Sequence, residues 1–312
     1  MLADILIFFV AIAFVAKGAT MATAYANNLA SNFRLSKYTV GFIVVAIISI
    51  LPETFIAISA ALDGIPSLGL GTLFGSNIVD LTLVFAILVF YARRNLKIES
   101  KILKNHAAYP LLLILPLLLG WDGYYSRFEG LALIVAGAAF YYNSLKHSRG
   151  NQRWSLPRKG WSRDLILLCL SMVVLLVGSH YVISSVTIIA QGFNVSPTII
   201  GMLIVGIGTT IPEMFFSMKA VKKRDDSMAV GDILGTVLAD GTVVVGLIAL
   251  ISPFYFSRTI IYVTGFFMVA AAFTVLHFMH SGHVLTRKEA VRLVAFWLLF
   301  VITELVISEY SR

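Results

Sequence analysis

Cysteine and charged residues are both scarce in this chain of 312 residues. The single cysteine, Cys169, cannot form an intrachain disulfide, and one thiolate is too few for a cysteine metal centre. Charged residues make up 13% of the sequence, whereas a soluble domain carries about 25%. The composition therefore excludes an ordinary soluble domain. The chain also lacks an H-E-x-x-H motif, which argues against an intramembrane metal hydrolase, and we do not expect an enzyme.

Apolar residues dominate the rest of the sequence. They account for 59% of the chain, and the mean hydropathy is +0.89. A helix needs about 20 predominantly apolar residues to cross a bilayer. Ten segments meet this condition, so we predict an all-α polytopic membrane protein with ten transmembrane helices. The segments are 2–30, 38–62, 67–91, 103–120, 127–146, 163–190, 197–219, 228–251, 258–280 and 288–308. The first has neither a basic start nor an A-x-A-like cleavage site, so we expect a retained helix rather than a signal peptide.

The basic residues are distributed unevenly between the connections. The net charge is +8, and most of the 24 Lys and Arg residues fall in the odd-numbered connections. Cytoplasmic loops carry such an excess, so the positive-inside rule predicts that these connections are cytoplasmic and that the N-terminus lies outside. We expect a multi-pass protein of the cell membrane, with the lipid bilayer and inorganic cations as partners. Because topology explains the basicity, we expect no nucleic-acid partner.

Residues 37–86 and 197–246 are two copies of one unit, offset by 160 positions. The basic stretch 147–162 contains Gly and Pro, and we interpret it as a cytoplasmic linker between two halves, 1–146 and 163–312. Five helices in each half force the second half to enter the membrane upside down. The sequence therefore predicts two inverted five-helix repeats, the arrangement of many secondary transporters. A monomer suffices for such a protein, and the sequence leaves the oligomeric state open.

Each copy carries acids within strongly apolar sequence. Glu53 and Asp80 in the first copy match Glu213 and Asp240 in the second. Intramembrane acids are costly and indicate an ion or proton pathway by default. Each Glu follows a proline, which removes a backbone donor and frees carbonyl oxygens. Carboxylates, carbonyls and neighbouring hydroxyls are the ligands that hard cations prefer, so four acids between the repeats predict a cation site.

These motifs resemble the α-repeats of the cation/Ca²⁺ antiporter superfamily, in particular its archaeal Na⁺/Ca²⁺ exchanger branch. The family pattern G-x-G-T-S-x-P-E is similar to residues 206–213, and G-S-N-x-x-D matches residues 75–80. The resemblance covers nearly the whole chain. It implies a secondary-active antiporter that exchanges Ca²⁺, or a related divalent cation, for Na⁺ by alternating access, with no cofactor. It also implies that helices one and six slide past a rigid core.

The same resemblance implies a set of ion ligands. Glu53 and Glu213 are the implied Ca²⁺ ligands, and Asp80 and Asp240 flank the centre. Oxygen atoms of other residues complete the implied set. Backbone oxygens come from Ser49 and Thr209, the monovalent sites use Thr209, Thr210, Ser76 and Thr236, and the set also includes Ala46 and Gly206.

The first copy departs from the family pattern at one of these positions. It reads Ile48-Ser49-Ile50 where the family has Gly-Thr-Ser, so an apolar side chain replaces a hydroxyl. By analogy, the monovalent site in the first half loses a ligand, and we expect fewer than three sodium ions per divalent cation. Na⁺ is favoured as the driving ion because neither repeat motif has the G-N pair that typically replaces Thr-Ser in proton-driven relatives. Coupling to H⁺ stays open, and so does dependence on K⁺, since some potassium-dependent relatives carry an acid at the position of Asp80.

Two further charged residues lie in apolar sequence. Lys17 lies deep in the first helix, and we weigh a lysine that extends to the membrane surface against a buried ammonium. A buried ammonium near the carboxylates would act as a counter-charge for the lost monovalent ion. Asp232 stands opposite Thr72 in the repeat, and it either lines the cytoplasmic mouth of the site or is solvated at a helix end. A passive cation channel is the alternative from another functional class, although channels usually use rings of like residues from several subunits.

Overall fold

The computed structural model describes residues 2–33, 35–62, 64, 66–99, 109–149, 160–192 and 206–310. Helices dominate these ranges, and seven of those described are long and apolar enough to cross a membrane. A bent pair, Lys37–Ser49 and Glu53–Leu62, would form an eighth span. Each of the ten predicted segments contains helix within the described ranges. Residues 103–108 and 197–205 of two predicted segments, and 150–159 of the predicted linker, lie outside them.

Short interruptions divide several of the predicted spans into smaller elements. The first part of the chain contains α1 (Leu2–Phe33), α2 (Lys37–Thr39), η1 (Val40–Val45), α3 (Ala46–Ser49), α4 (Leu51–Leu62), α5 (Pro66–Val79), η2 (Asp80–Val84), α6 (Phe85–Ala92), β1 (Leu96–Lys97), α8 (Tyr109–Leu119), β2 (Tyr124–Tyr125) and α9 (Arg127–Arg149). The second contains α10 (Trp161–Gly192), α12 (Gly206–Thr209), α13 (Ile211–Lys222), α14 (Asp226–Ala239), η4 (Asp240–Val244), α15 (Val245–Ile251), β3 (Phe254–Tyr255), η5 (Ile260–Gly265), α16 (Phe266–His280), β4 (Val284–Leu285) and α17 (Arg287–Tyr310). Elements labelled η are π-helical turns.

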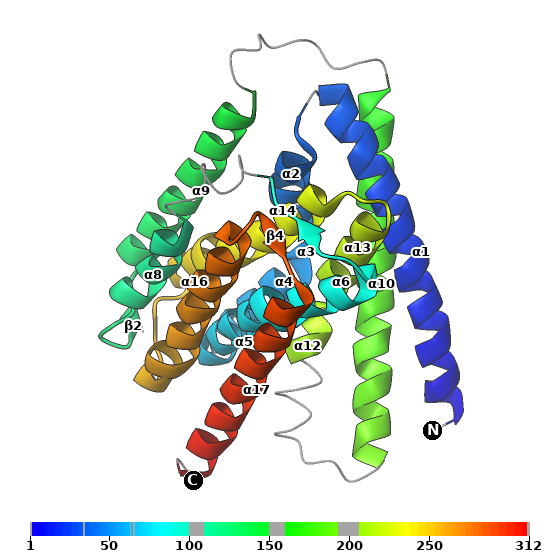
Figure 1. The fold of residues 1–312 in the computed structure, drawn as a ribbon. Helices are drawn as coiled ribbons and strands as arrows, with labels where there is room; N and C mark the ends of the chain where they lie inside the picture. The colour runs from blue at the N-terminus through cyan, green and yellow to red at the C-terminus, as the bar shows by residue number, and fades with distance from the viewer. Residues whose placement is uncertain are drawn as a thin grey trace.

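The helices divide into a buried core and a lipid-facing periphery. In the most apolar stretch of each span, 83% of the residues are buried in Asp226–Ile251 and 78% in Leu68–Ala92. The corresponding shares for α1 and α17 are 28% and 22%. The long helices α1 and α10 lie side by side along one flank of this core (Figure 1). A helix that is apolar on all sides is stable when other helices surround it or when it faces lipid. The predicted acids lie in the core.

Two short antiparallel strand pairs join connections that are distant in sequence. β1 pairs with β4, with Leu96 opposite Leu285, and β2 pairs with β3, with Tyr124 opposite Tyr255. The first pair joins two odd-numbered connections of the predicted topology, and the second joins two even-numbered ones. Strands that pair must lie on the same side of the membrane, so both pairs agree with alternating spans. The two ends of the described chain also lie at one end of the molecule, as an even number of spans requires (Figure 1).

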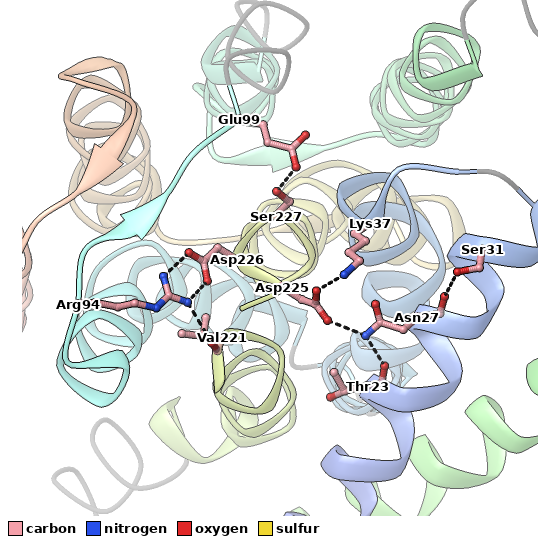
Figure 2. A network of polar contacts seen from close by, with 10 residues as sticks. All are labelled: Thr23, Asn27, Ser31, Lys37, Arg94, Glu99, Val221, Asp225, Asp226 and Ser227. Atoms are coloured by element: carbon pink, nitrogen blue, oxygen red, sulfur yellow. Dashed lines mark hydrogen bonds and ion pairs between the residues drawn. The ribbon is translucent and has the colours of Figure 1, made fainter. Parts of the chain in front are cut away.

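A network of polar contacts holds the beginning of α14 against three other parts of the chain (Figure 2). Asp225 accepts hydrogen bonds from the Lys37 ammonium and from Asn27 Nδ2, the latter at 2.8 Å. Asp226 accepts two from the Arg94 guanidinium, both at 2.6 Å. Paired charge-assisted bonds of this kind are the stronger class of protein hydrogen bond. Adjacent acids thus connect α14 to α1, to α2 and to the segment after α6.

Replacing Arg94 by Ala should destabilise the fold by about 2 kcal/mol, because the buried Asp226 carboxylate loses its two charged donors. Thermal unfolding of the purified protein in detergent measures the effect. Lys97→Ala is the matched control, since only the backbone N–H of Lys97 contacts Asp226, at 2.9 Å. It should stay within about 0.5 kcal/mol of the parent protein. Equal losses in the two variants would contradict a specific role for the Arg94 side chain.

Candidate functional site: buried acids between two broken helices

Two helices break at equivalent positions of the two copies. The first break is at Ile50, between α3 and α4, and the second is at Thr210, between α12 and α13. Each lies two residues before a proline, which has no N–H with which to continue the helix. The helical axes on either side of the first break meet at 44°. Glu53 and Glu213 consequently lie in the first turn of a new helix, where the helix dipole favours negative charge.

Asp80 and Asp240 each begin a π-helical turn. η2 starts at Asp80 and η4 starts at Asp240, so the two copies depart from α-helical geometry at the same place. Such turns are rare and are frequent at functional sites. Because an independent local distortion would not recur at the matched acid, we attribute the π-helical turn to the repeated unit itself.

The four predicted acids are all buried. Glu53 is 2% exposed, Asp80 is 1% exposed, and Glu213 and Asp240 are fully buried. Glu53 interacts electrostatically with the other three, so the four occupy one region of the core. Oxygen atoms of all four have no hydrogen-bond partner in the described part of the chain, including both carboxylate oxygens of Glu213 and of Asp240. A buried carboxylate without a partner is very costly, so this region requires cations or protons.

Hydroxyl groups from the two copies meet beside these acids. The Ser49 and Thr236 oxygens are 3.2 Å apart, which joins α3 to α14. Ser76 donates to the Leu73 carbonyl at 3.1 Å, and Thr210 donates to the Ile207 carbonyl at 2.8 Å. All four hydroxyls, together with that of Thr209, belong to buried residues. The predicted hydroxyl ligands therefore lie in the same core as the acids.

The two predicted ligands without a polar side chain differ in what the structure describes. The Ala46 carbonyl accepts from the Ile50 N–H at 3.1 Å and from the Ser49 hydroxyl at 3.2 Å, so both of its lone pairs are in use. Gly206 begins α12, and its backbone is described. Within the described ranges, no three residues of Asp, Glu, His or Cys approach closely enough to hold one metal ion. An ion bound here must therefore take hydroxyl or carbonyl oxygens as well.

Sequence reasoning assigned no role to one polar residue of this core, Asn77, and left the role of another, Asp232, open. Asn77 donates to the Val237 carbonyl at 3.3 Å, and its own Oδ1 is buried without a partner among the described residues. Asp232 is fully buried, which rules out an acid solvated at a helix end. Asn77 lies within the matched G-S-N-x-x-D motif, so that motif was a usable signal. For Asp232 the only signal was its mismatch with Thr72 in the first copy.

The prediction of a buried counter-charge at Lys17 is wrong. The Lys17 side chain is exposed on α1, while the carboxylates it was expected to neutralise are buried in the core. The neighbouring residues of α1 alternate between exposed and buried as one face of the helix turns towards α10. Lys17 lies on the face that turns away. The single cysteine of the chain, Cys169, is also exposed, and it lies on α10.

Comparison with known proteins identifies relatives over nearly the whole chain. The family model for sodium/calcium exchanger protein matches residues 3–146 and 164–306. Inner membrane protein YrbG of Escherichia coli is 28% identical over 73% of this chain and 74% of its own length. Sodium/calcium exchanger MaX1 of Methanosarcina acetivorans is 21% identical over 96% of this chain and 97% of its own. The sodium-calcium exchanger NCX_Mj, in a structure soaked with Na⁺ and Sr²⁺, superposes with a TM-score of 0.85 at 21% identity, covering 96% of this chain and 98% of that one.

Proposed function

Because the chain belongs to the family of sodium/calcium exchanger proteins, we propose that it is a secondary-active antiporter exchanging Ca²⁺, or a related divalent cation, for Na⁺ by alternating access. The observation that carries this proposal is the set of buried side-chain atoms without partners. Among the described residues there are eight such atoms, all of them oxygens, and seven belong to carboxylates. Oxygen atoms with no donor attract hard cations, and a buried site of this charge is favourable only when cations occupy it or protons neutralise it.

Contacts between equivalent residues of the two copies support the proposed inverted arrangement of the halves 1–146 and 163–312, which the proposed linker 147–162 joins. Asn77 contacts Val237, which stands 160 positions later. Such a contact between a residue and its own counterpart is what a two-fold axis relating the copies would produce. The approach of α1 to α10 follows the same rule, since Gly18 faces Leu175 and Gly178 faces Val15, the counterpart of Leu175. The two stretches matched by the family model also coincide with these halves.

In the proposed site, Glu53 and Glu213 bind the divalent cation between the two broken helices. The hydroxyls of Ser76, Thr209, Thr210 and Thr236 contribute to sites for monovalent ions, and Asp80 and Asp240 flank the centre. α1 and α10 are the elements proposed to slide past the core. The side chains of Asn28 and Asn32 on α1 both donate to Asp164 of α10, which ties the two helices together as one unit.

Transport by purified protein in liposomes tests the function directly. Uptake of radioactive Ca²⁺ should follow an imposed Na⁺ gradient. It should be small under a pH gradient or with equal solutions on both sides. Uptake driven by the pH gradient alone would favour H⁺ coupling. Uptake that follows the Ca²⁺ gradient without any counter-ion would favour a channel and contradict the proposal.

Cysteine labelling tests the proposed orientation, with the N-terminus outside. Lys223→Cys and Asp122→Cys, each on a Cys169→Ala background, occupy exposed positions in connections of opposite parity. An impermeant thiol reagent applied to intact cells should label the cysteine at 122 and spare the one at 223, because basic connections are cytoplasmic. The unsubstituted Cys169→Ala protein controls for background. Labelling of both positions from outside would contradict the alternating topology.

A further inference from the structure

A fifth buried acid lies next to the candidate site, and neither the repeat pattern nor the proposed exchange mechanism uses it. Asp232 on α14 is fully buried and precedes Thr236 by four residues, so the two share one face of the helix. Ser217 on α13 follows Glu213 by four residues, and it is also fully buried. Asp232 and Ser217 therefore form a layer one helical turn, about 5.4 Å, from Glu213 and Thr236. The layer is displaced towards the connection between α13 and α14.

The contacts of Asp232 leave one of its carboxylate oxygens without a partner among the described residues. Ser217 donates to Asp232 Oδ2 at 3.1 Å, while Asp232 Oδ1 is buried without a partner in the described part of the chain. The Ser49 side chain lies beside both Asp232 and Glu213. Within the same part of the chain, the ion pairs of Lys and Arg are made with Asp225 and Asp226, and no basic side chain pairs with Asp232. When Asp232 is ionised, its charge therefore has to be balanced by a bound cation rather than by a basic side chain.

The first copy shows that this acid is not required by the architecture. The positions equivalent to Ser217 and Asp232 are Ala57 and Thr72. Ala57 offers no polar atom, and the Thr72 hydroxyl donates to the carbonyl of Leu68 in its own helix at 2.9 Å. The same helix pair is thus built without a buried acid in this layer in one copy. The Asp232 and Ser217 pair is an addition of the second copy, next to the half of the site that kept its hydroxyls.

We propose that Asp232, Ser217 and Ser49 bind an additional monovalent cation of the Na⁺ type. One carboxylate with neutral hydroxyl oxygens matches a single positive charge and the preference of hard cations for oxygen. Such an ion would lie beside the divalent site. It would replace, in the number of charges moved per cycle, the monovalent ion that the first half loses because Ile50 offers no hydroxyl. The inference rests on the proposed function, because it assigns a further site to the monovalent ion that drives exchange.

The Na⁺ dependence of Ca²⁺ exchange tests this site in liposomes. Asp232→Asn removes the charge and should raise the Na⁺ concentration for half-maximal exchange by about tenfold, as expected for loss of one charged ligand, and should lower the Hill coefficient for Na⁺. Ser217→Ala should raise that concentration less than Asp232→Asn does, and Ser217→Thr, which keeps the hydroxyl, should raise it less than Ser217→Ala. Thr72→Ala is the matched control in the first copy and should leave the Na⁺ dependence unchanged.

Two further measurements separate the possible results. Na⁺ should raise the unfolding temperature of the purified parent protein, and it should do so less in Ser217→Ala than in Ser217→Thr, which tests binding without transport. A merely structural contact between α13 and α14 would lower stability equally with and without Na⁺, and that result would overturn the proposal. An unchanged Na⁺ dependence in both Asp232→Asn and Ser217→Ala would overturn it as well. Absence of Na⁺-driven Ca²⁺ uptake by the parent protein would instead overturn the proposed function.

Discussion

Glu53→Gln and Glu213→Gln are each expected to reduce exchange of radioactive Ca²⁺ in liposomes by about 100-fold or more. Each substitution keeps the shape of the side chain and removes one negative charge from a site that is almost completely buried. Loss of one charged partner from a desolvated site costs about 3 kcal/mol or more in binding. The two residues stand at equivalent positions of the two copies, and each contributes its own carboxylate, so neither can replace the other. Both variants should therefore lose Ca²⁺ exchange.

Glu304→Gln is the matched control for these two variants. Glu304 is a partly buried carboxylate on α17 that accepts a hydrogen bond from Thr264 at 2.6 Å, and it belongs to no proposed ion site. It should transport Ca²⁺ like the parent protein. Thermal unfolding of the Glu53 and Glu213 variants should show intact folds, because replacing an unpartnered buried carboxylate with an amide removes a cost. Transport close to that of the parent protein in either Glu variant would contradict the assignment of the divalent site.

The membrane-spanning character and the breaks in the helices could be predicted from the sequence, because both depend on local chemistry. Long apolar stretches are stable across the hydrocarbon interior of a bilayer. Pro52 and Pro212 lack the backbone N–H that a helix requires, wherever in a helix they occur. Burial of the four acids could be predicted for a similar reason. Burying a carboxylate in a membrane costs so much free energy that acids at equivalent positions of two apolar repeats do not persist by chance. These features follow from residue type and spacing alone.

Other features depend on which face of a helix meets which neighbour, and spacing does not determine that. A buried ammonium facing the acids was one of two alternatives for Lys17, but α1 turns one face to α10 and exposes the face that carries Lys17. The partner of Asp232 is Ser217, fifteen residues earlier and on a different helix, and no local pattern connects them. The π-helical turns that begin at Asp80 and Asp240 carry no shared local signal either, since the second turn contains a glycine, Gly241, and the first contains neither Pro nor Gly.

Restoring a hydroxyl at position 50 should add a Na⁺ ligand to the first half of the site. Ile50 is buried at the break between α3 and α4 and offers no oxygen, whereas Thr210 at the equivalent break carries a hydroxyl. Ile50→Ser should therefore raise the Hill coefficient for Na⁺ in Ca²⁺ exchange by about one, because oxygen ligands are what a hard cation requires. Ile50→Val, which stays apolar and β-branched, is the control and should leave the Hill coefficient unchanged.

The same substitution on an Asp232→Asn background distinguishes the two monovalent sites. If Ile50 and Asp232 belong to different sites, Ile50→Ser should raise the Hill coefficient equally with and without Asp232→Asn, because effects at independent sites add. The reversal potential of exchange, measured against opposing Na⁺ and Ca²⁺ gradients, should shift in the same direction, since each added Na⁺ moves one more charge per divalent cation. An Ile50→Ser protein with the Hill coefficient and reversal potential of the parent would show that the missing hydroxyl does not limit Na⁺ binding. The first-half monovalent site would then have to draw its ligands from the backbone around Ser49 rather than from side chains.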